Sequence, residues 1–475
     1  MLFPTFEFAC FFVFVFYVNW LLVHLNQDRK VFLLVASYFF YGSWDVHFLV
    51  LLAGSGVANF ALGLAIDKVR SIPRWGAFLE RSVVCLGVIF NLGVLGVFKY
   101  YNFFVTSLSA LLHQFGISGG LPILDLVLPL GISFFTFQGI SYLVDIYNKK
   151  IQAEARLEDV LLFFGFFPHL LAGPIVRASE FMPQLKTVPR PQKIEATRAL
   201  LLIAFGLFKK MVLANHLGVE IVDPVFSAPQ NCSTLDVLFG AYAYAIYIYC
   251  DFSAYSDMAI GFAKLLGFEF PINFDQPYRS QSLQEFWRRW HISLSRWLRD
   301  YLFIPLGGSR AGEWKTYRNI LVTMLLGGIW HGASWTFVAW GFYHGAGLAL
   351  ERWNRNRHGP PCSCRWSTVG SILFVFHFVC LGWIFFRCEN FDKVLRYLTA
   401  FTHITWASHW MTPFSVLLVA TGGILNFMPK IVFQGFEEKA GEMPKPVLGL
   451  VFGLFLVFLS AVSPEEISPF IYFRF

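Results

Sequence analysis

The sequence predicts an all-α polytopic integral membrane protein, and three observations lead to this fold class. Hydrophobic residues make up 56% of the 475 residues and charged residues only 14%, whereas roughly 25% of an average soluble chain is charged. The 56 phenylalanines and 15 tryptophans carry more apolar surface than one water-soluble core could bury. Long apolar runs recur along the chain. These features exclude a soluble enzyme, a disordered protein and a nucleic-acid-binding module.

The apolar runs predict about eleven membrane segments. The first run, 6–25, has the roughly 20 residues needed to cross a hydrocarbon core. No basic stretch precedes it and no small-residue cleavage site follows it, so we expect a retained span and no cleavable signal peptide. The further runs lie at about 31–66, 82–105, 123–147, 160–176, 197–213, 235–265, 318–350, 367–386, 413–433 and 446–463.

The charged loops predict the sidedness of these segments. Basic residues dominate the loops 67–81, 177–198, 279–318 and 351–366. By contrast, loop 106–122 has no charged residue, and loop 214–236 has acids but no base. Because basic loops are retained on the cytoplasmic side, the first four are predicted to be cytoplasmic and the last two external. By the same alternation the tail 463–475 is expected outside, as a candidate docking strand.

The run 318–350 is too long for one span and lies between two loops predicted to be cytoplasmic. A continuous helix of that length would reach roughly 50 Å, against a hydrocarbon core of about 30 Å. We therefore expect a broken or re-entrant hairpin that breaks within Gly327–Gly332, where helix propensity is weakest. His331 would then lie at the inner turn, deep in the membrane. The run 160–176, which contains Pro168–His169, is also predicted to be re-entrant.

Residues 281–300 predict an amphipathic helix at the cytoplasmic membrane interface. Ser282 and Glu285 form a capping-box pattern at its start. Apolar residues then recur every three or four positions, and four arginines fall on the other face. The apolar stripe is Leu283, Phe286, Trp287, Trp290, Leu294, Trp297, Leu298 and Tyr301, and the arginines are Arg288, Arg289, Arg296 and Arg299. His291 falls on the shoulder between the two faces.

Ionisable residues within the membrane are the first candidates for function, because they are expensive to place in hydrocarbon. Of the twelve histidines, His331 is the strongest candidate, followed by His291. An imidazole suits acyl transfer because its pKa of about 6.5 lets it accept a proton from a hydroxyl or thiol at neutral pH. His169 and His344 are weaker candidates. The other histidines are predicted to be interfacial or to bond a neighbouring helix.

Other chemistries have less support. Asp251 and Asp257 lie at the end of an apolar run, where a structural role is favoured over direct catalysis. Cys362 and Cys364 form a Cys-x-Cys without a second pair nearby, so we predict reduced thiols and no metal site. The chain contains no P-loop and no His-Glu-x-x-His motif, which leaves NTPase and zinc-protease functions unsupported.

Two motifs resemble the membrane-bound O-acyltransferase (MBOAT) family. They are FWRRWHISLSRWLRDYLFIPLGG at 286–308 and GGIWHGASW at 327–335. The supporting motifs are Pro129–Gln138, Phe167–Pro174 and Asp251–Gly261. The resemblance covers almost the whole chain and is greatest to the bacterial branch that O-acetylates alginate. It implies the MBOAT fold, a single membrane-embedded domain over 1–475 with broken helices around a central tunnel.

The resemblance also implies roles for individual residues. His331 matches the family's catalytic histidine in Trp-His-Gly, and His291 matches a second histidine that is Asn in some branches. We expect His331 to act as general base on the acceptor hydroxyl, with a transient acyl-imidazole as the variant. His291 would position a substrate or shuttle the proton. Further expected donor or tunnel contacts are Trp287, Arg288, Arg289, Trp330, Asp251, Asp257 and Asn273.

Substrates and partners are implied in the same way. The expected donor is acetyl-coenzyme A, docked at the basic face of 279–318, and no bound cofactor or metal is expected. The acetyl group would cross the bacterial inner membrane to an extracytoplasmic polysaccharide such as alginate, through a periplasmic SGNH esterase-like partner and an export complex. Cellulose, peptidoglycan or teichoic-acid D-alanylation stay open as alternatives. An acetyl carrier that performs no chemistry is the alternative from another class.

Overall fold

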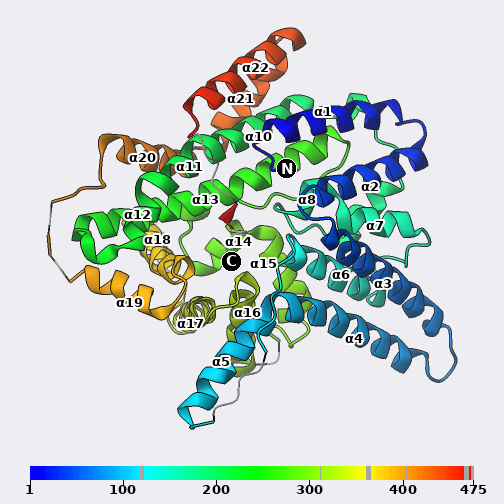
Figure 1. Cartoon of the computed structure of the whole chain (residues 1–475), viewed down its shortest axis with the longest axis horizontal. Coiled ribbons are helices and arrows are strands. Elements are labelled where there is room, and N and C mark those ends of the chain that lie inside the picture. The colour runs from blue at the N-terminus through cyan, green and yellow to red at the C-terminus, as the bar shows by residue number, and fades with distance from the viewer. Residues whose placement is uncertain are drawn as a thin grey trace. The chain divides into compact units, whose positions relative to one another are not determined.

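The computed structural model describes residues 1–117, 122–310, 312–359, 365–402, 404–405, 407–464 and 470–471. Every regular element in these ranges is a helix (Figure 1), as predicted. The Cys-x-Cys at 362–364 lies outside the described residues, as does most of the 463–475 tail. Contacts divide the chain into two compact units, Met1–Ile194 with Phe262–Pro271, and Glu195–Gly261 with Ile272–Phe475.

The first unit is a set of helices packed through aromatic side chains. Its core includes Phe8, Phe40 and Phe167, whose rings meet at 5.7–6.2 Å between centroids. The run 160–176, predicted to be re-entrant, forms two short helices and is buried except for half-buried Leu161. The helices are α1 (Phe6–Leu21), α2 (Asn26–Gly42), α3 (His47–Arg70), α4 (Gly76–Leu95), η1 (Gly96–Tyr100), α5 (Tyr101–Gln114), α6 (Ile132–Tyr147), α7 (Leu157–Gly165), α8 (Phe167–Leu170), α9 (Ala178–Leu185) and η2 (Pro191–Lys193).

The second unit contains both motifs and all the leading candidate residues. Only the last turn of its long helix α13 belongs to the first unit. The helices are α10 (Ala196–Phe208), η3 (Lys209–Ala214), α11 (Asn215–Leu217), η4 (Gly218–Val222), α12 (Asp223–Ser227), η5 (Pro229–Asn231), α13 (Thr234–Leu265), η6 (Pro277–Arg279), α14 (Leu283–Arg289), α15 (Ile292–Leu298), η7 (Arg299–Phe303), α16 (Glu313–His331), α17 (Trp335–His358), α18 (Arg365–Arg387), α19 (Phe391–Ala400), α20 (Pro413–Phe427), α21 (Lys430–Glu442) and α22 (Lys445–Val462).

Six helices among the described residues are long and apolar enough to cross a membrane. A seventh arises if α20 and α21, which meet at an 88° bend, form one broken span. The other expected membrane segments form shorter or less apolar helices. The six spans are His47–Arg70, Gly76–Gln114, Ala196–Ser227, Thr234–Leu265, Trp366–Arg387 and Lys445–Val462. The fold is therefore that of an all-α polytopic membrane protein.

The expected single helix over 281–300 is interrupted, and this corrects the sequence-based prediction. α14 ends at Arg289 and α15 begins at Ile292. His291 between them has φ 42° and ψ 56°, a left-handed conformation that L-residues rarely adopt. The apolar periodicity continues in phase across the break, so a pattern of period three to four could not reveal it.

The hairpin over 318–350 breaks after His331, at the end of the predicted segment. α16 continues helically through Gly327 and Gly328 to His331, and α17 starts at Trp335. A Cβ on Gly328 would lie 2.3 Å from the main-chain oxygen of Phe337 and 3.0 Å from Cα of Gly341. This glycine therefore permits close packing of α16 on α17 instead of ending the helix.

Candidate active site

His331 ends α16 inside an aromatic cage. Its side chain is 3% exposed. Ring centroids of Trp330, Trp340 and Phe386 lie 5.0, 5.1 and 5.2 Å from its own. Because α16 stops at this residue and α17 returns three residues later, the imidazole projects at the turn of a tightly packed helix pair.

His291 lies beside His331, with 6.4 Å between the ring centroids. Its side chain is fully buried, and the rings of Phe252 and Trp330 lie 4.6 and 6.0 Å away. Burial lowers the pKa of His291 to about 3, because an enclosed apolar cage penalises the imidazolium. The structure thus brings together the two histidines that the sequence singled out, and His291 is neutral at physiological pH.

An apolar cavity of about 180 Å³ is lined in part by His331. Its wall is formed by one face of each of α15, α16 and α17, with Trp287 of α14. The principal lining residues are Trp287, Leu294, Leu298, Met324, His331 and Trp340. Such a lining suits an uncharged, flexible chain that would deliver a reactive group to the imidazole.

A larger cavity of about 620 Å³ adjoins the first and is strongly basic. The two cavities share Trp287, Ser295, Arg299, Phe303, Ile320 and Leu348. The carboxylate of Glu351, which also lines the larger cavity, accepts hydrogen bonds from the main-chain nitrogens of Leu283 and Gln284. The arginines in its wall are Arg288, Arg296, Arg299, Arg352 and Arg355. Guanidinium groups in this number favour a phosphate-bearing ligand.

Three of the other residues predicted to contact the donor or the tunnel lie at the two cavities or beside the histidines. Trp287 lines both cavities and Arg288 lines the basic one. Trp330 packs against both His291 and His331. The sequence predicted these residues from the amphipathic pattern of 281–300 and from the motif around His331.

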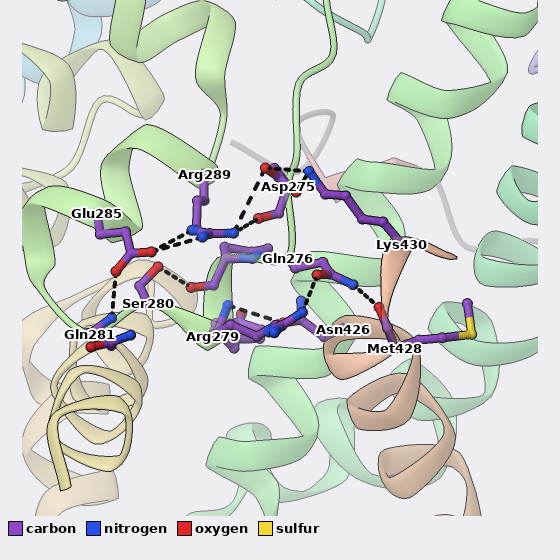
Figure 2. Close-up of polar contacts among 12 residues, drawn as sticks. Asp275, Gln276, Arg279, Ser280, Gln281, Glu285, Arg289, Asn426, Met428 and Lys430 are labelled. Carbon is purple, nitrogen blue, oxygen red and sulfur yellow. Dashed lines mark hydrogen bonds and ion pairs between the residues drawn. The ribbon is translucent and has the colours of Figure 1, made fainter. Parts of the chain in front are cut away.

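Arg289 was expected at the donor site, and the structure places it elsewhere. Figure 2 shows its guanidinium between Glu285 and Asp275, with Lys430 on the other side of Asp275. Its Nη1 also donates to the main-chain oxygen of Asp275 at 3.1 Å. Adjacent positions on a short helix point in different directions, so Arg288 reaches the cavity whereas Arg289 holds a loop.

Asp251 and Asp257 each form an ion pair with a lysine. Asp251 pairs with Lys210 at 2.7 Å with both side chains fully buried, and it accepts a hydrogen bond from the main-chain nitrogen of Ile471. Asp257 pairs with Lys209 at 2.6 Å. Within the described part of the chain, neither aspartate lines the two cavities above.

Sequence reasoning missed several residues that the structure places at the site. Trp340, Leu348 and Arg352 lie on the cavity side of α17. Their spacing of eight and four residues was the available signal, because it marks one helix face. His344 lies between Trp340 and Leu348 on this face and is fully buried. Among the described residues its ring nitrogens have no hydrogen-bond partner.

The described part of the chain contains no cluster of three or more His, Cys, Asp or Glu side chains that could hold a metal ion. The site is therefore built from two imidazoles, aromatic rings and a basic entrance. In a multi-pass membrane protein, two buried imidazoles beside an apolar and a basic cavity define a candidate enzyme active site.

Comparison with known proteins identifies the class. The family model for MBOAT, the membrane-bound O-acyltransferase family, matches residues 155–391. The chain is 38% identical over 94% of its length to a protein of Azotobacter vinelandii named "probable alginate O-acetylase AlgI", covering 95% of that protein. A protein of the same name from Pseudomonas putida is 39% identical, with 95% of each chain covered. The peptidoglycan O-acetyltransferase of Helicobacter pylori is 39% identical over 78% of this chain and 73% of its own.

The chain belongs to the membrane-bound O-acyltransferase family, and it is a membrane O-acyltransferase. The matched range contains His291, His331 and every residue that lines the two cavities. The resemblance found in the sequence motifs is thereby confirmed.

Proposed function

We propose that this enzyme transfers an acetyl group from acetyl-coenzyme A, across the bacterial inner membrane, for O-acetylation of an extracytoplasmic polysaccharide. The observation that carries the proposal is the continuity of the two cavities. An arginine-lined cavity of about 620 Å³ adjoins an apolar cavity of about 180 Å³ that His331 lines.

The donor fits this sequence of environments. The phosphates of coenzyme A pair with the guanidinium groups of Arg288, Arg296 and Arg352 at the entrance. Its pantetheine arm follows the apolar wall past Trp287, and its thioester reaches His331. Because the coenzyme carries several negative charges, it cannot cross the hydrocarbon core. An acetyl group that is transferred at His331 is uncharged and can cross it.

The chemistry is general-base acyl transfer. His331 accepts the proton of the acceptor hydroxyl, whose oxygen forms a bond to the thioester carbonyl carbon. The carbon–sulfur bond then breaks, and the proton on His331 passes to the departing thiolate. An acyl-imidazole on His331 is the variant. Neutral His291 lies alongside and positions the reacting groups.

Alginate is the acceptor that we favour, because the two relatives matched over almost their full lengths carry that name. Peptidoglycan is the second candidate, supported by the Helicobacter pylori relative. We further propose that a periplasmic SGNH esterase-like partner, within a polysaccharide-export complex, completes delivery to the polymer.

The test compares wild type with His331→Ala and His291→Ala in a strain that makes the native exopolysaccharide. Ester-linked acetate on the polymer is measured, with membrane insertion checked for each variant. We expect acetate to be lost with His331→Ala and strongly reduced with His291→Ala. His377→Ala is the control, because His377 is an exposed imidazole that bonds Tyr242 outside both cavities.

Full acetylation in inserted His331→Ala would refute the proposed site. Thioester consumption by the purified protein separates enzyme from carrier. An enzyme releases free coenzyme A in a reaction that depends on His331, whereas a carrier without chemistry leaves the coenzyme acylated.

A further inference from the structure

We propose that Asn273 is a positioning residue that holds the imidazole of His291 in the active site by capping the helix that follows it. The inference rests on the proposed function, because it assigns Asn273 a role through His291. It replaces the expectation that Asn273 contacts the donor or the tunnel. In the described part of the chain, Asn273 lines neither of the two cavities.

The conformation of His291 requires an explanation. His291 is the N-cap residue of α15, and its left-handed backbone is strained for a residue with a Cβ. N-cap side chains normally accept hydrogen bonds from the free main-chain nitrogens of the first helical turn. The imidazole of His291 makes no such bond, and it is turned instead towards His331.

Asn273 supplies the missing cap from a distant part of the chain. Its main-chain oxygen accepts from the nitrogen of Ile292 at 2.9 Å. Its Oδ1 accepts from the nitrogen of Ser293 at 3.2 Å and from the Ser293 hydroxyl at 2.8 Å. The first turn of α15 is thus satisfied without the side chain of His291, which leaves that imidazole available to the site.

The cap is itself anchored. The side-chain nitrogen of Asn273 donates to the hydroxyl of Ser256 on α13 at 3.0 Å. Asn273 is 1% exposed and Ser256 equally buried, so these bonds do not compete with water. A single amide therefore ties the start of α15 to a long helix of the same unit.

A second contact closes the loop on the other side of His291. The main-chain nitrogen of Asp275 donates to the oxygen of Arg289 at 2.9 Å. The Arg289 side chain returns to Asp275, which Lys430 also contacts (Figure 2). The turn at Trp290–His291 is consequently held at both ends by 273–275, which explains why a strained conformation persists.

The experiment measures acetyl transfer kinetics of the full-length protein with Asn273→Leu and Asn273→Asp. Leucine keeps the number and branching of the side-chain heavy atoms and removes every side-chain hydrogen bond, whereas aspartate keeps the acceptor for Ser293. We expect Asn273→Leu to lower kcat about 10–100-fold, the range for residues that orient a functional ligand, with the donor KM changed less than about twofold. Asn273→Asp should recover most of kcat.

A double-mutant cycle tests whether Asn273 acts through His291. In a His291→Gln background, Asn273→Leu should cause almost no further loss, because the imidazole that it positions is absent. Asn91→Leu is the matched control. Asn91 is also buried with three side-chain hydrogen bonds, two with Asn59 and one to the main-chain oxygen of Gly87, and its substitution should leave kcat per inserted protein unchanged.

Equal losses in both backgrounds, or an effect confined to the donor KM, would overturn the inference while leaving the proposed function intact. Full activity of His291→Gln together with His291→Ala would instead contradict the role of His291 in the proposed function. If Asn273→Leu fails to insert, Ser293→Ala provides the test. It removes the 2.8 Å bond from the Ser293 hydroxyl to Asn273 and should lower kcat by about threefold, and unchanged kcat would contradict the inference.

Discussion

The imidazole of His291 shows how catalysis and stability compete at one residue. Its enclosure among Phe252, Trp330 and His331 keeps it neutral, and this suits a group that positions reactants or relays a proton. The same enclosure has a thermodynamic consequence. In the unfolded chain the ring is free to take up a proton that the folded protein excludes.

We expect the stability of the protein to fall in acid partly through His291. Its folded pKa of about 3 lies below the unfolded value near 6.5. The contribution of His291 to the free energy of unfolding is therefore fully present above about pH 6.5. It is lost as the pH falls towards the folded pKa, by up to about 1.4 kcal/mol per pH unit. His291→Phe removes the titrating imidazole, so the free energy of unfolding in detergent should fall less steeply as the pH is lowered. Ser295→Ala, which removes no titrating group, should keep the wild-type slope, and equal slopes for both variants would contradict the prediction.

The buried pair of Lys210 and Asp251 provides a second prediction at this scale. The two groups are 2.7 Å apart and fully enclosed. Asp251→Asn removes the carboxylate that faces the buried Lys210 ammonium, so the free energy of unfolding should fall by about 3–5 kcal/mol. Replacing both residues, as in Lys210→Met with Asp251→Leu, should recover most of the loss in thermal unfolding. Asp392→Asn, which breaks an exposed pair with Arg396, should have little effect, and a comparable loss there would refute the argument.

At the scale of elements, the hairpin of α16 and α17 decides where His331 lies. Sequence reasoning predicted a hairpin, and the structure has two helices that turn between His331 and Trp335. It placed the weak point within Gly327–Gly332 because glycine destabilises an isolated helix. In the folded protein Gly328 serves packing, since the main chain of α17 occupies the space that a side chain would need.

The adjacent glycines give a matched comparison. Gly328→Ala would force a Cβ to within 2.3 Å of the Phe337 oxygen, whereas Gly327→Ala meets only the tip of Leu298 at 3.2 Å. Both changes gain helix propensity, so their difference isolates the contact. We expect Gly328→Ala to lower the free energy of unfolding by about 1–3 kcal/mol and to reduce activity at least tenfold through displacement of His331. Equal stability and activity of the two variants would show that the close packing of α16 on α17 at Gly328 is not required.

At the scale of the whole molecule, the excess of basic residues has two uses. The basic charge of the ranges 279–318 and 351–366 predicts that they lie on the cytoplasmic side. The same ranges contain all five arginines of the basic cavity. The charge pattern that predicts the sidedness therefore also predicts that the basic cavity opens on the cytoplasmic side.

The entrance can be tested through its charge. Arg296→Gln and Arg352→Gln should each raise the KM for acetyl-coenzyme A about 3–10-fold, with little change in kcat, because they weaken binding remote from the thioester. The variants should also show a weaker dependence of KM on ionic strength. The assay uses inverted membrane vesicles, in which the cytoplasmic face is accessible. Arg396→Gln removes the same charge from α19, outside both cavities, and an equal rise in its KM would argue against a specific entrance.

Much of the site could be predicted from local pattern. His291 and His331 lie side by side, and Trp287 lines the same cavity as His331. The helical stripe and the hairpin turn in the sequence place these three residues on facing elements. Arg289, Asp251 and Asp257 were grouped with the donor contacts and prove to hold other parts of the fold. Sequence alone could not separate these cases, since the identity of a charged residue next to a functional one does not reveal which way its side chain points.

The sequence by itself determined the membrane class, the helical fold, the sidedness signal and the two histidines. These properties depend on local composition, because the free energy of moving a segment from water to lipid is a sum over its own residues. Only the tertiary structure decided that α14 stops before His291, that Asn273 caps α15, and that the apolar cavity lined by His331 adjoins the basic one. These features depend on close packing and hydrogen bonds between residues distant along the chain, and such contacts leave no periodic trace in the sequence.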